Sequence, residues 1–239
     1  MLKEQYLAAT VAQVTAVAEQ AAAIEEAARL IADSLVGGGA VHLFDTGHLV
    51  SHELVNRAGG LAAFRPLRYE LRVENPVAGR SPAGAAPAAL AAAILGASAV
   101  RAGDVLLVGS VSGRDGLLVE LVLTARRLGV KVVAVTSRAQ SEPLTSGHPS
   151  GLRLFEAADL VLDNGAPPGD AWLAVDGIPT RVCPASGVGA AVVLWALVAE
   201  VVEQLAARGT PPQVFRSANL PDGPEFNRHV EEVYARRGY

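Results

Sequence analysis

A polar stretch near residue 50 carries several side chains that are able to transfer protons. The segment 45-DTGH-48 ends an apolar run, and His52, Glu53 and Arg57 follow closely. Moving a proton between adjacent carbons, or removing one beside a carbonyl, needs a carboxylate or an imidazole within hydrogen-bond reach. Glu53 is the first candidate for this base and His48 the second, because His52 lies about 100° round a helix from Glu53. The alternative for Glu53 is a surface glutamate paired with Arg57.

A second polar turn, 110-SVSGRD-115, has the composition of an anion site. Ser110 and Ser112 offer hydroxyl groups, and Gly113 lets the backbone approach a ligand closely. A helix starting here would direct free N–H groups and the positive end of its dipole outward, which suits a phosphate. The alternative is that Ser112 caps this helix, with Asp115 completing a capping box. Both roles are compatible.

The pattern of apolar residues predicts the elements that hold these turns. Each turn follows a short apolar run without polar alternation, which is typical of strands in a parallel sheet covered on both faces. Helical patterns alternate with these strands and indicate a three-layer, doubly wound α/β fold with a mainly parallel sheet. We predict strands at residues 40–44, 104–109, 130–137 and 159–164, an irregular strand at 61–73, a loop at 74–88, and helices at 3–36, 48–58, 113–128, 186–208 and in the tail.

The carboxyl ends of the strands set the expected ligand site, because open parallel sheets bind ligands beyond those ends. Both polar turns lie there. We expect one domain over residues 1–239, with a helical extension at about 1–36 and a helical tail at about 219–239.

The composition excludes several classes of function. The formal charge of −4 provides no overall basic field, so we expect no nucleic-acid partner. The longest apolar runs, at 86–100 and 187–199, are shorter than the roughly 20 residues of a membrane span, so we expect no membrane partner. One cysteine, Cys183, and no evident signal peptide favour a cytoplasmic location. Asp163, Asn164 and Asp170 are ordinary turn formers, and we predict neither a metal nor a cofactor.

Several motifs resemble one known family. The S-x-S-G turn after a buried strand, followed by a helix and 130-VKVVAVTS-137, looks like the sugar isomerase (SIS) domain, a flavodoxin-like module that binds phosphosugars. More closely, 41-VHLFDTGH-48, 57-RAGGL-61, 159-DLVLDN-164 and 215-FRSANLPDG-223 are similar to a bacterial group of SIS-domain proteins. The similarity covers nearly the whole chain.

The resemblance implies roles for individual residues. It places Thr46, Gly47 and His48 in the first ligand loop, and it places Ser110, Ser112 and Gly113 in the phosphate turn. Glu53 matches the catalytic glutamate that phosphoheptose isomerases carry on a helix. Arg57 lies four residues further on, on the same helix face, and we expect it to contact the substrate. The implied substrate is a sugar phosphate, isomerised through an enediol without a cofactor.

Two departures from the family pattern leave other functions open. Asp115 stands where many SIS domains have a Ser or Thr that touches phosphate, so it would repel a phosphate unless Arg114, Arg65 or Arg68 intervenes. Residues 186–205 contain no histidine where phosphoheptose isomerases have a catalytic one, so we expect another reaction. The alternatives are a sugar-phosphate lyase or etherase, a non-catalytic sensor, and a ligand without phosphate.

The helices also predict an assembly. The segment 3–36 carries apolar residues over a wide arc, and 187–199 is apolar nearly all round, which is more than one helical layer needs to cover. SIS domains pair through such helices. We therefore expect a two-fold homodimer or a homotetramer, with the ligand site beside the subunit boundary.

Overall fold

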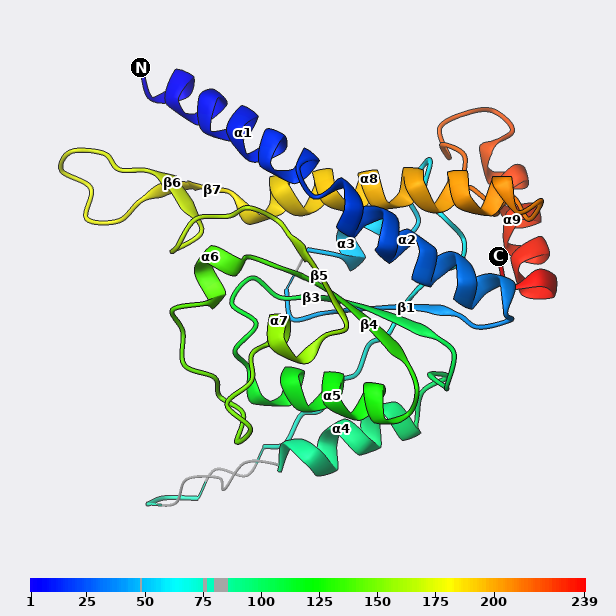
Figure 1. The fold of residues 1–239 in the computed structure, drawn as a ribbon, viewed down its shortest axis with the longest axis horizontal. Coiled ribbons are helices and arrows are strands. Elements are labelled where there is room, and N and C mark those ends of the chain that lie inside the picture. The colour runs from blue at the N-terminus through cyan, green and yellow to red at the C-terminus, as the bar shows by residue number, and fades with distance from the viewer. Residues whose placement is uncertain (48, 75–76, 80–85) are drawn as a thin grey trace.

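The central feature of the computed structural model is a five-stranded sheet. The structure describes residues 1–47, 49–74, 77–79 and 86–239. The strands are β1 (Val41–Asp45), β2 (Phe64–Pro66), β3 (Val105–Gly109), β4 (Lys131–Thr136) and β5 (Leu160–Asp163). They are hydrogen-bonded in the order β2-β1-β3-β4-β5, and every neighbouring pair is parallel (Figure 1). This confirms the predicted parallel sheet, and the order is that of flavodoxin-like folds.

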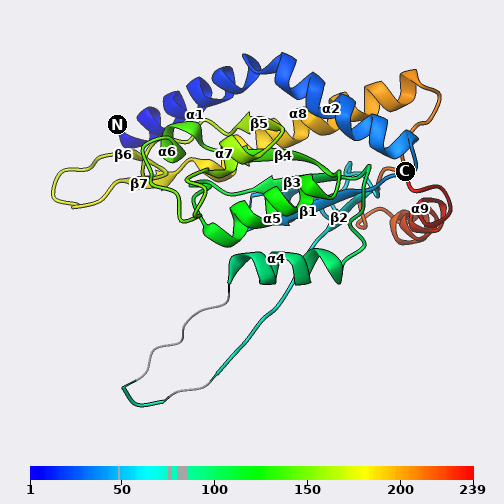
Figure 2. The same cartoon turned by 60° about the horizontal axis from the view of Figure 1, so that its bottom comes forward.

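Helices cover both faces of this sheet, as predicted. On one face α2 (Ala21–Val36) and α8 (Ser186–Ala207) pack against inward side chains such as Val41, Leu43 and Leu107. On the other face α4 (Pro87–Gly96), α5 (Gly116–Arg127) and α7 (Leu154–Ala157) pack against alternate residues, including Leu106 and Val108. Figure 2 shows the three layers. Strands buried on both faces read as continuous apolar runs, which is why their sequence lacks polar alternation.

The N-terminal segment is two helices, so the prediction of a single helix over residues 3–36 is wrong. α1 (Leu2–Ala18) and α2 meet at an angle of 59°. The cause is Gln20, whose amide donates to the Asp163 carbonyl at 2.8 Å and accepts from the Asp163 N–H at 2.8 Å. These bonds fix the break on the end of β5. On the N-terminal side of this break, α1 lies beside α8 and contacts β6 (Ala171–Leu173) (Figure 1).

The remaining elements lie around the sheet. β6 pairs antiparallel with β7 (Val182–Pro184) in a projecting hairpin, and α9 (Gly223–Arg237) forms the predicted helical tail. Two further short helices, of the same length as α7, are α3 (Ser51–Leu54) and α6 (Arg138–Ser141). α9 is held to β2 by Arg65, which pairs with Glu231 at 2.6 Å and stacks over Tyr234. Arg65 therefore ties the C-terminal helix to the edge of the sheet.

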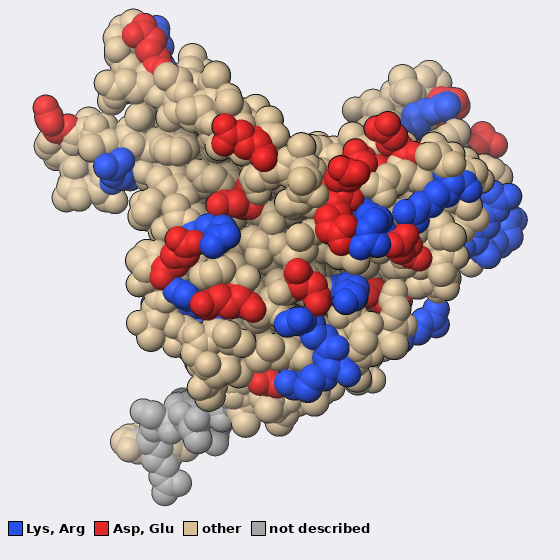
Figure 3. All heavy atoms as spheres, viewed as in Figure 1, with Lys and Arg blue, Asp and Glu red and all other residues tan. Residues whose placement is uncertain are grey.

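α8 has the length and hydropathy of a membrane span, although 187–199 alone is shorter than one. Nine of its 22 residues are buried, many of them against α2 and the sheet. A core helix passes the same test of length and composition, and the position of α8 over the sheet accounts for its apolar residues. The surface in Figure 3 mixes acidic and basic side chains over this side of the molecule.

Candidate functional site

The two polar turns meet beyond the carboxyl ends of β1 and β3, as the sequence predicts. The strand order reverses at this pair, and the crevice at such a switch point is the usual ligand site of an open α/β sheet. The Thr46 N–H donates to the Gly109 carbonyl at 3.1 Å, and the Thr46 hydroxyl lies 3.1 Å from the Ser110 hydroxyl. The two turns are therefore one polar surface.

The first turn is held by Asp45, a residue that sequence analysis did not single out. Its carboxylate accepts the N–H groups of Leu49 at 3.0 Å, Val50 at 3.2 Å and Ser51 at 2.7 Å. The turn also packs closely on β3, because a Cβ on Gly109 would lie 2.7 Å from the Val50 side chain. The sequence feature that could have identified Asp45 is its position as the last residue of a buried strand.

The second turn directs its carbonyl groups into the protein. The Val111 carbonyl accepts from the Thr136 hydroxyl at 3.1 Å, the Ser112 carbonyl from Ser141 at 2.7 Å, and the Gly113 carbonyl from the Leu154 N–H at 2.7 Å. The N–H groups of Val111 and Ser112 donate no hydrogen bond to any described residue. Free N–H groups on a turn form a concavity that binds anions.

Asp115 is the N-terminal cap of α5, so the interpretation that Ser112 caps this helix is wrong. α5 begins at Gly116, not at Gly113, and the Asp115 carboxylate accepts the Leu118 N–H at 2.8 Å. The positive end of the α5 dipole therefore already faces a carboxylate. An anion between the turns would depend on the free N–H groups and hydroxyls of residues 110–112.

Two cavities adjoin the loop of Thr46 and Gly47, and both residues line each cavity. The smaller has a volume of about 390 Å³ and is also lined by Ser110, Ser112 and Gln140. The larger, of about 900 Å³, takes in Asp45, Ser51, His52, Arg68 and Asp115. The structure thus brings Thr46, Gly47, Ser110 and Ser112 together at one cavity. Sequence analysis missed Gln140, which reaches this cavity from α6, a helix of four residues.

Glu53 and Arg57 lie away from these cavities. The Glu53 carboxylate accepts from Trp195 Nε1 of α8 at 2.7 Å and from Arg57 at 3.2 Å, and neither Glu53 nor Arg57 lines either cavity. The predicted helix over 48–58 is wrong in extent, because α3 ends at Leu54 and Val55 is extended. The expectation that Glu53 and Arg57 share a helix face fails for the same reason, although their ion pair forms. His48 lies outside the described residues.

Other polar candidates are engaged elsewhere. Asp170 lines the smaller cavity, but its carboxylate caps α8 by accepting from the Ser186 N–H and hydroxyl, both at 2.7 Å. His148 is half-buried against α5, with Nε2 2.7 Å from Glu120. Cys183 is a free, half-buried thiol. Among the described residues, no three His, Cys, Asp or Glu side chains are grouped to hold a metal.

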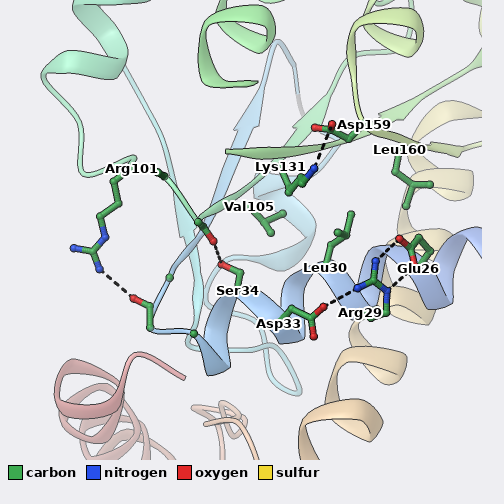
Figure 4. A pocket seen from close by; sticks show the side chains of 15 residues that line it. Glu26, Arg29, Leu30, Asp33, Ser34, Arg101, Val105, Lys131, Asp159 and Leu160 are labelled. Carbon is green, nitrogen blue, oxygen red and sulfur yellow. Dashed lines mark hydrogen bonds and ion pairs between the residues drawn. The ribbon is translucent and has the colours of Figure 1, made fainter. Parts of the chain in front are cut away.

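A further hollow of about 830 Å³ lies at the opposite edge of the sheet, between α2 and the amino ends of the strands (Figure 4). Its three acidic and three basic side chains balance in number, and most of them are paired. Arg29 bonds both Glu26 and Asp33, and Lys131 lies 3.9 Å from Asp159. Paired surface charges of this kind leave no net field for a ligand.

Comparison with known proteins relates the chain to a described family. The sequence model of the SIS domain matches residues 5–137. The UPF0309 protein of Streptomyces coelicolor is 39% identical, over 92% of this chain and 89% of that protein.

Two solved structures have the same fold. One is the sugar isomerase domain of an RpiR transcription factor from Sphaerobacter thermophilus, with 19% identity, a TM-score of 0.50 and 98% of each chain covered. The other is the Vibrio vulnificus NanR protein complexed with ManNAc-6P, with 14% identity, a TM-score of 0.51, and 99% of this chain and 68% of that chain covered. At these identities the likeness concerns the fold.

Proposed function

This chain belongs to the SIS domain family, and on that premise we propose that it binds a phosphosugar between the turns after β1 and β3. The observation that carries the proposal is the cavity at Thr46, Ser110 and Ser112, where hydroxyl groups and the free N–H groups of Val111 and Ser112 converge. Hydroxyl and backbone N–H donors are suited to phosphate oxygens. NanR, which shares the fold, is itself complexed with ManNAc-6P.

Asp115 does not oppose this assignment as strongly as its charge suggests. Its carboxylate is held by the Leu118 N–H at the positive end of α5, which offsets part of its negative charge. Arg68 lines the same larger cavity and supplies a positive charge there. A phosphate at residues 110–112 with the sugar extending toward Arg68 and His52 would use both cavities.

We propose sugar-phosphate isomerisation as the activity, with Glu53 as the general base and His48 as a second proton-transfer group. The base would take a proton from the carbon next to the carbonyl, and the resulting enediol would regain a proton on the adjacent carbon. Trp195 and Arg57 each donate a hydrogen bond to the Glu53 carboxylate and would hold it in one orientation. The location proposed for this reaction is the cytoplasm.

A non-catalytic sensor of the same ligand is the second candidate. The observation that favours it is the position of Glu53, which is bonded to Trp195 and lines neither cavity. The two candidates share the phosphosugar site and differ only in proton transfer. A lyase or etherase would also begin with proton abstraction beside a carbonyl, and its products would identify it.

The binding test is a thermal-shift screen of the purified protein with sugar phosphates and the matching free sugars. A ligand at 100 times its Kd stabilises the native state by roughly 2.7 kcal/mol. We expect stabilisation by at least one sugar phosphate and its loss in Ser110→Ala, whose hydroxyl lies on the cavity. Stabilisation by free sugars alone would rule out the phosphate assignment.

The catalytic test uses solvent deuterium. For the sugar phosphate that binds, an isomerase or lyase in D₂O should incorporate deuterium next to the carbonyl, which NMR detects. Glu53→Gln should keep binding and lose the exchange. Binding without exchange in the native protein would assign the sensor role, and exchange that persists in Glu53→Gln would remove Glu53 as the base.

We also propose that two copies of the chain pair through α1. Leu7, Val11 and Val14 lie at helical spacing on one face and are 61%, 66% and 39% exposed. A different face of α1 packs on the same chain, where Gln13 bonds the Asn164 and Ala185 carbonyls. Sedimentation should give two or four times the chain mass of 24.6 kDa, and Leu7→Asp should reduce it. A native protein that sediments as a monomer would exclude the pairing.

A further inference from the structure

A buried histidine and aspartate line a cavity outside the proposed phosphosugar site. His42 lies in β1 and Asp104 immediately before β3, at the amino ends of those strands. His42 Nε2 is 2.9 Å from Asp104 Oδ2, and the two residues are 7% and 1% exposed. Neighbouring Val41 and Leu43 face α2 and α8, so His42 faces the α4 side of the sheet.

The hydrogen bonds of Asp104 determine which nitrogen of His42 carries a proton. Oδ1 accepts the Ala40 N–H at 2.9 Å, and Oδ2 accepts the Arg101 N–H at 2.9 Å. An ionised carboxylate can only accept hydrogen bonds, so in its contact with His42 the ring Nε2 is the donor. In the neutral ring the single proton is therefore on Nε2. Nδ1 is then an acceptor. Nδ1 receives no hydrogen bond from any described residue, and it is not fully enclosed by protein.

The cavity beside His42 has a volume of about 520 Å³ and mostly apolar walls. Ile94, Ala97, Leu67 and Tyr69 line it. The charged group that remains for a ligand is Arg68, which forms no ion pair with a described carboxylate.

The terminal guanidinium nitrogens of the other two arginines at this cavity form hydrogen bonds within the protein. Arg65 is paired with Glu231, and the Arg101 guanidinium turns away to bond the Gly38 carbonyl at 3.1 Å (Figure 4). Among the described residues, the polar groups left for a ligand therefore include one acceptor, on His42, and the cation of Arg68, beside the buried Arg65 Nε–H, which has no hydrogen-bond partner.

We propose that this cavity is a second binding site, for a small carboxylic acid that carries a hydroxyl group on an apolar chain or ring. The carboxylate would pair with the Arg68 guanidinium, whose planar donors fit it in a bidentate manner. The hydroxyl would donate to His42 Nδ1, and the apolar part would lie against Ile94 and Ala97. Small-molecule sites typically combine apolar walls with a few polar groups in this way.

The site would also be linked to the proposed phosphosugar site through a shared wall. Leu67, Arg68 and Tyr69 line both the His42 cavity and the larger cavity at Thr46. A carboxylate at Arg68 would withdraw that cation from the other cavity. This coupling rests on the proposed function, whereas binding at His42 does not.

The test is an NMR titration of the purified protein at millimolar concentrations of 3-hydroxybutyrate and 4-hydroxyphenylacetate, with butyrate and phenylacetate as matched acids lacking the hydroxyl. We expect a hydroxy acid to shift the His42 ring resonances and to bind more tightly than its matched acid. The difference should be about fivefold, the value of one hydrogen bond of roughly 1 kcal/mol.

Two variants at α4 and its C-terminal end supply the control. Ala97, the C-cap of α4, lines the cavity and is exposed, so Ala97→Trp should place a ring in the cavity without disturbing the core and should abolish binding. Ala93→Trp, at an exposed position of α4 that does not line the cavity, should leave binding unchanged. His42→Gln should lose the preference for the hydroxyl.

Two results would overturn the proposal. They are an absence of any shift at His42 with every acid, and binding that survives Ala97→Trp. Neither result bears on the phosphosugar site, because sugar-phosphate binding is scored separately through Ser110→Ala.

Discussion

Replacing Gly113 with alanine should show how strictly the second turn is shaped. Gly113 has a φ of +55°, and a Cβ there would lie 2.8 Å from the Cβ of Leu154, a fully buried residue. The left-handed backbone costs a residue with a side chain roughly 1–2 kcal/mol. Overpacking against a buried neighbour costs roughly another 1–3 kcal/mol. We therefore expect Gly113→Ala to lower the free energy of unfolding by roughly 2–5 kcal/mol.

Gly151→Ala is the matched control for this prediction. Gly151 has a φ of +76°, and nothing lies within 4 Å of a Cβ placed on it, so only the backbone cost applies. Urea unfolding of both variants should show a larger loss for Gly113→Ala, and each kcal/mol should also lower Tm by about 2–4 °C. Sugar-phosphate binding should fall in Gly113→Ala alone. Equal losses in the two variants would show that Leu154 does not restrain the turn.

Three more predictions concern single contacts. The Arg153 side chain holds the pKa of Glu156 at about 2, so the stability that Glu156 contributes is complete above about pH 4.5 and is lost toward pH 2. Urea unfolding should therefore show Glu156→Gln to be less stable than the native protein above about pH 4.5, and this difference should shrink as the pH falls to 2. Asp170→Ala removes the cap of α8 and should lower the free energy of unfolding by about 1 kcal/mol in the same assay. An unchanged free energy of unfolding would show that Asp170 does not stabilise α8. Trp195→Phe removes a hydrogen bond to Glu53 and should slow the exchange of substrate protons with solvent about fivefold, while ligand affinity stays unchanged. A change in ligand affinity without a change in exchange rate would contradict a positioning role for Trp195.

The strands and the edge of the sheet that carries the site could be predicted from the sequence. Segments such as 104–109 and 130–137 must be buried on both faces because they are apolar throughout, and this property is local. Parallel strands bring their carboxyl ends to one edge. The meeting of Thr46 with Ser110 therefore follows from where each strand ends, without knowledge of any long-range contact.

The lengths and directions of the polar elements depended on partners that local patterns do not reveal. α3 is a single turn, and Asp45 takes the N–H groups that precede and begin it. The N-terminal helix breaks at Gln20 because that side chain bonds Asp163, 143 residues away. Asp115 rather than Ser112 caps α5. Helical propensity predicted none of these, because each is decided by a specific hydrogen bond.

The sequence by itself determined the α/β class, the strand positions and the two polar turns, because hydrophobic periodicity reports burial directly. Only the tertiary structure decided what the chemical groups face. Glu53 is turned to Trp195, 142 residues away, and His42 is bonded to Asp104, 62 residues away. The direction of a polar side chain depends on which donor or acceptor the fold brings within about 3 Å of it, and that partner is set by the packing of the whole chain.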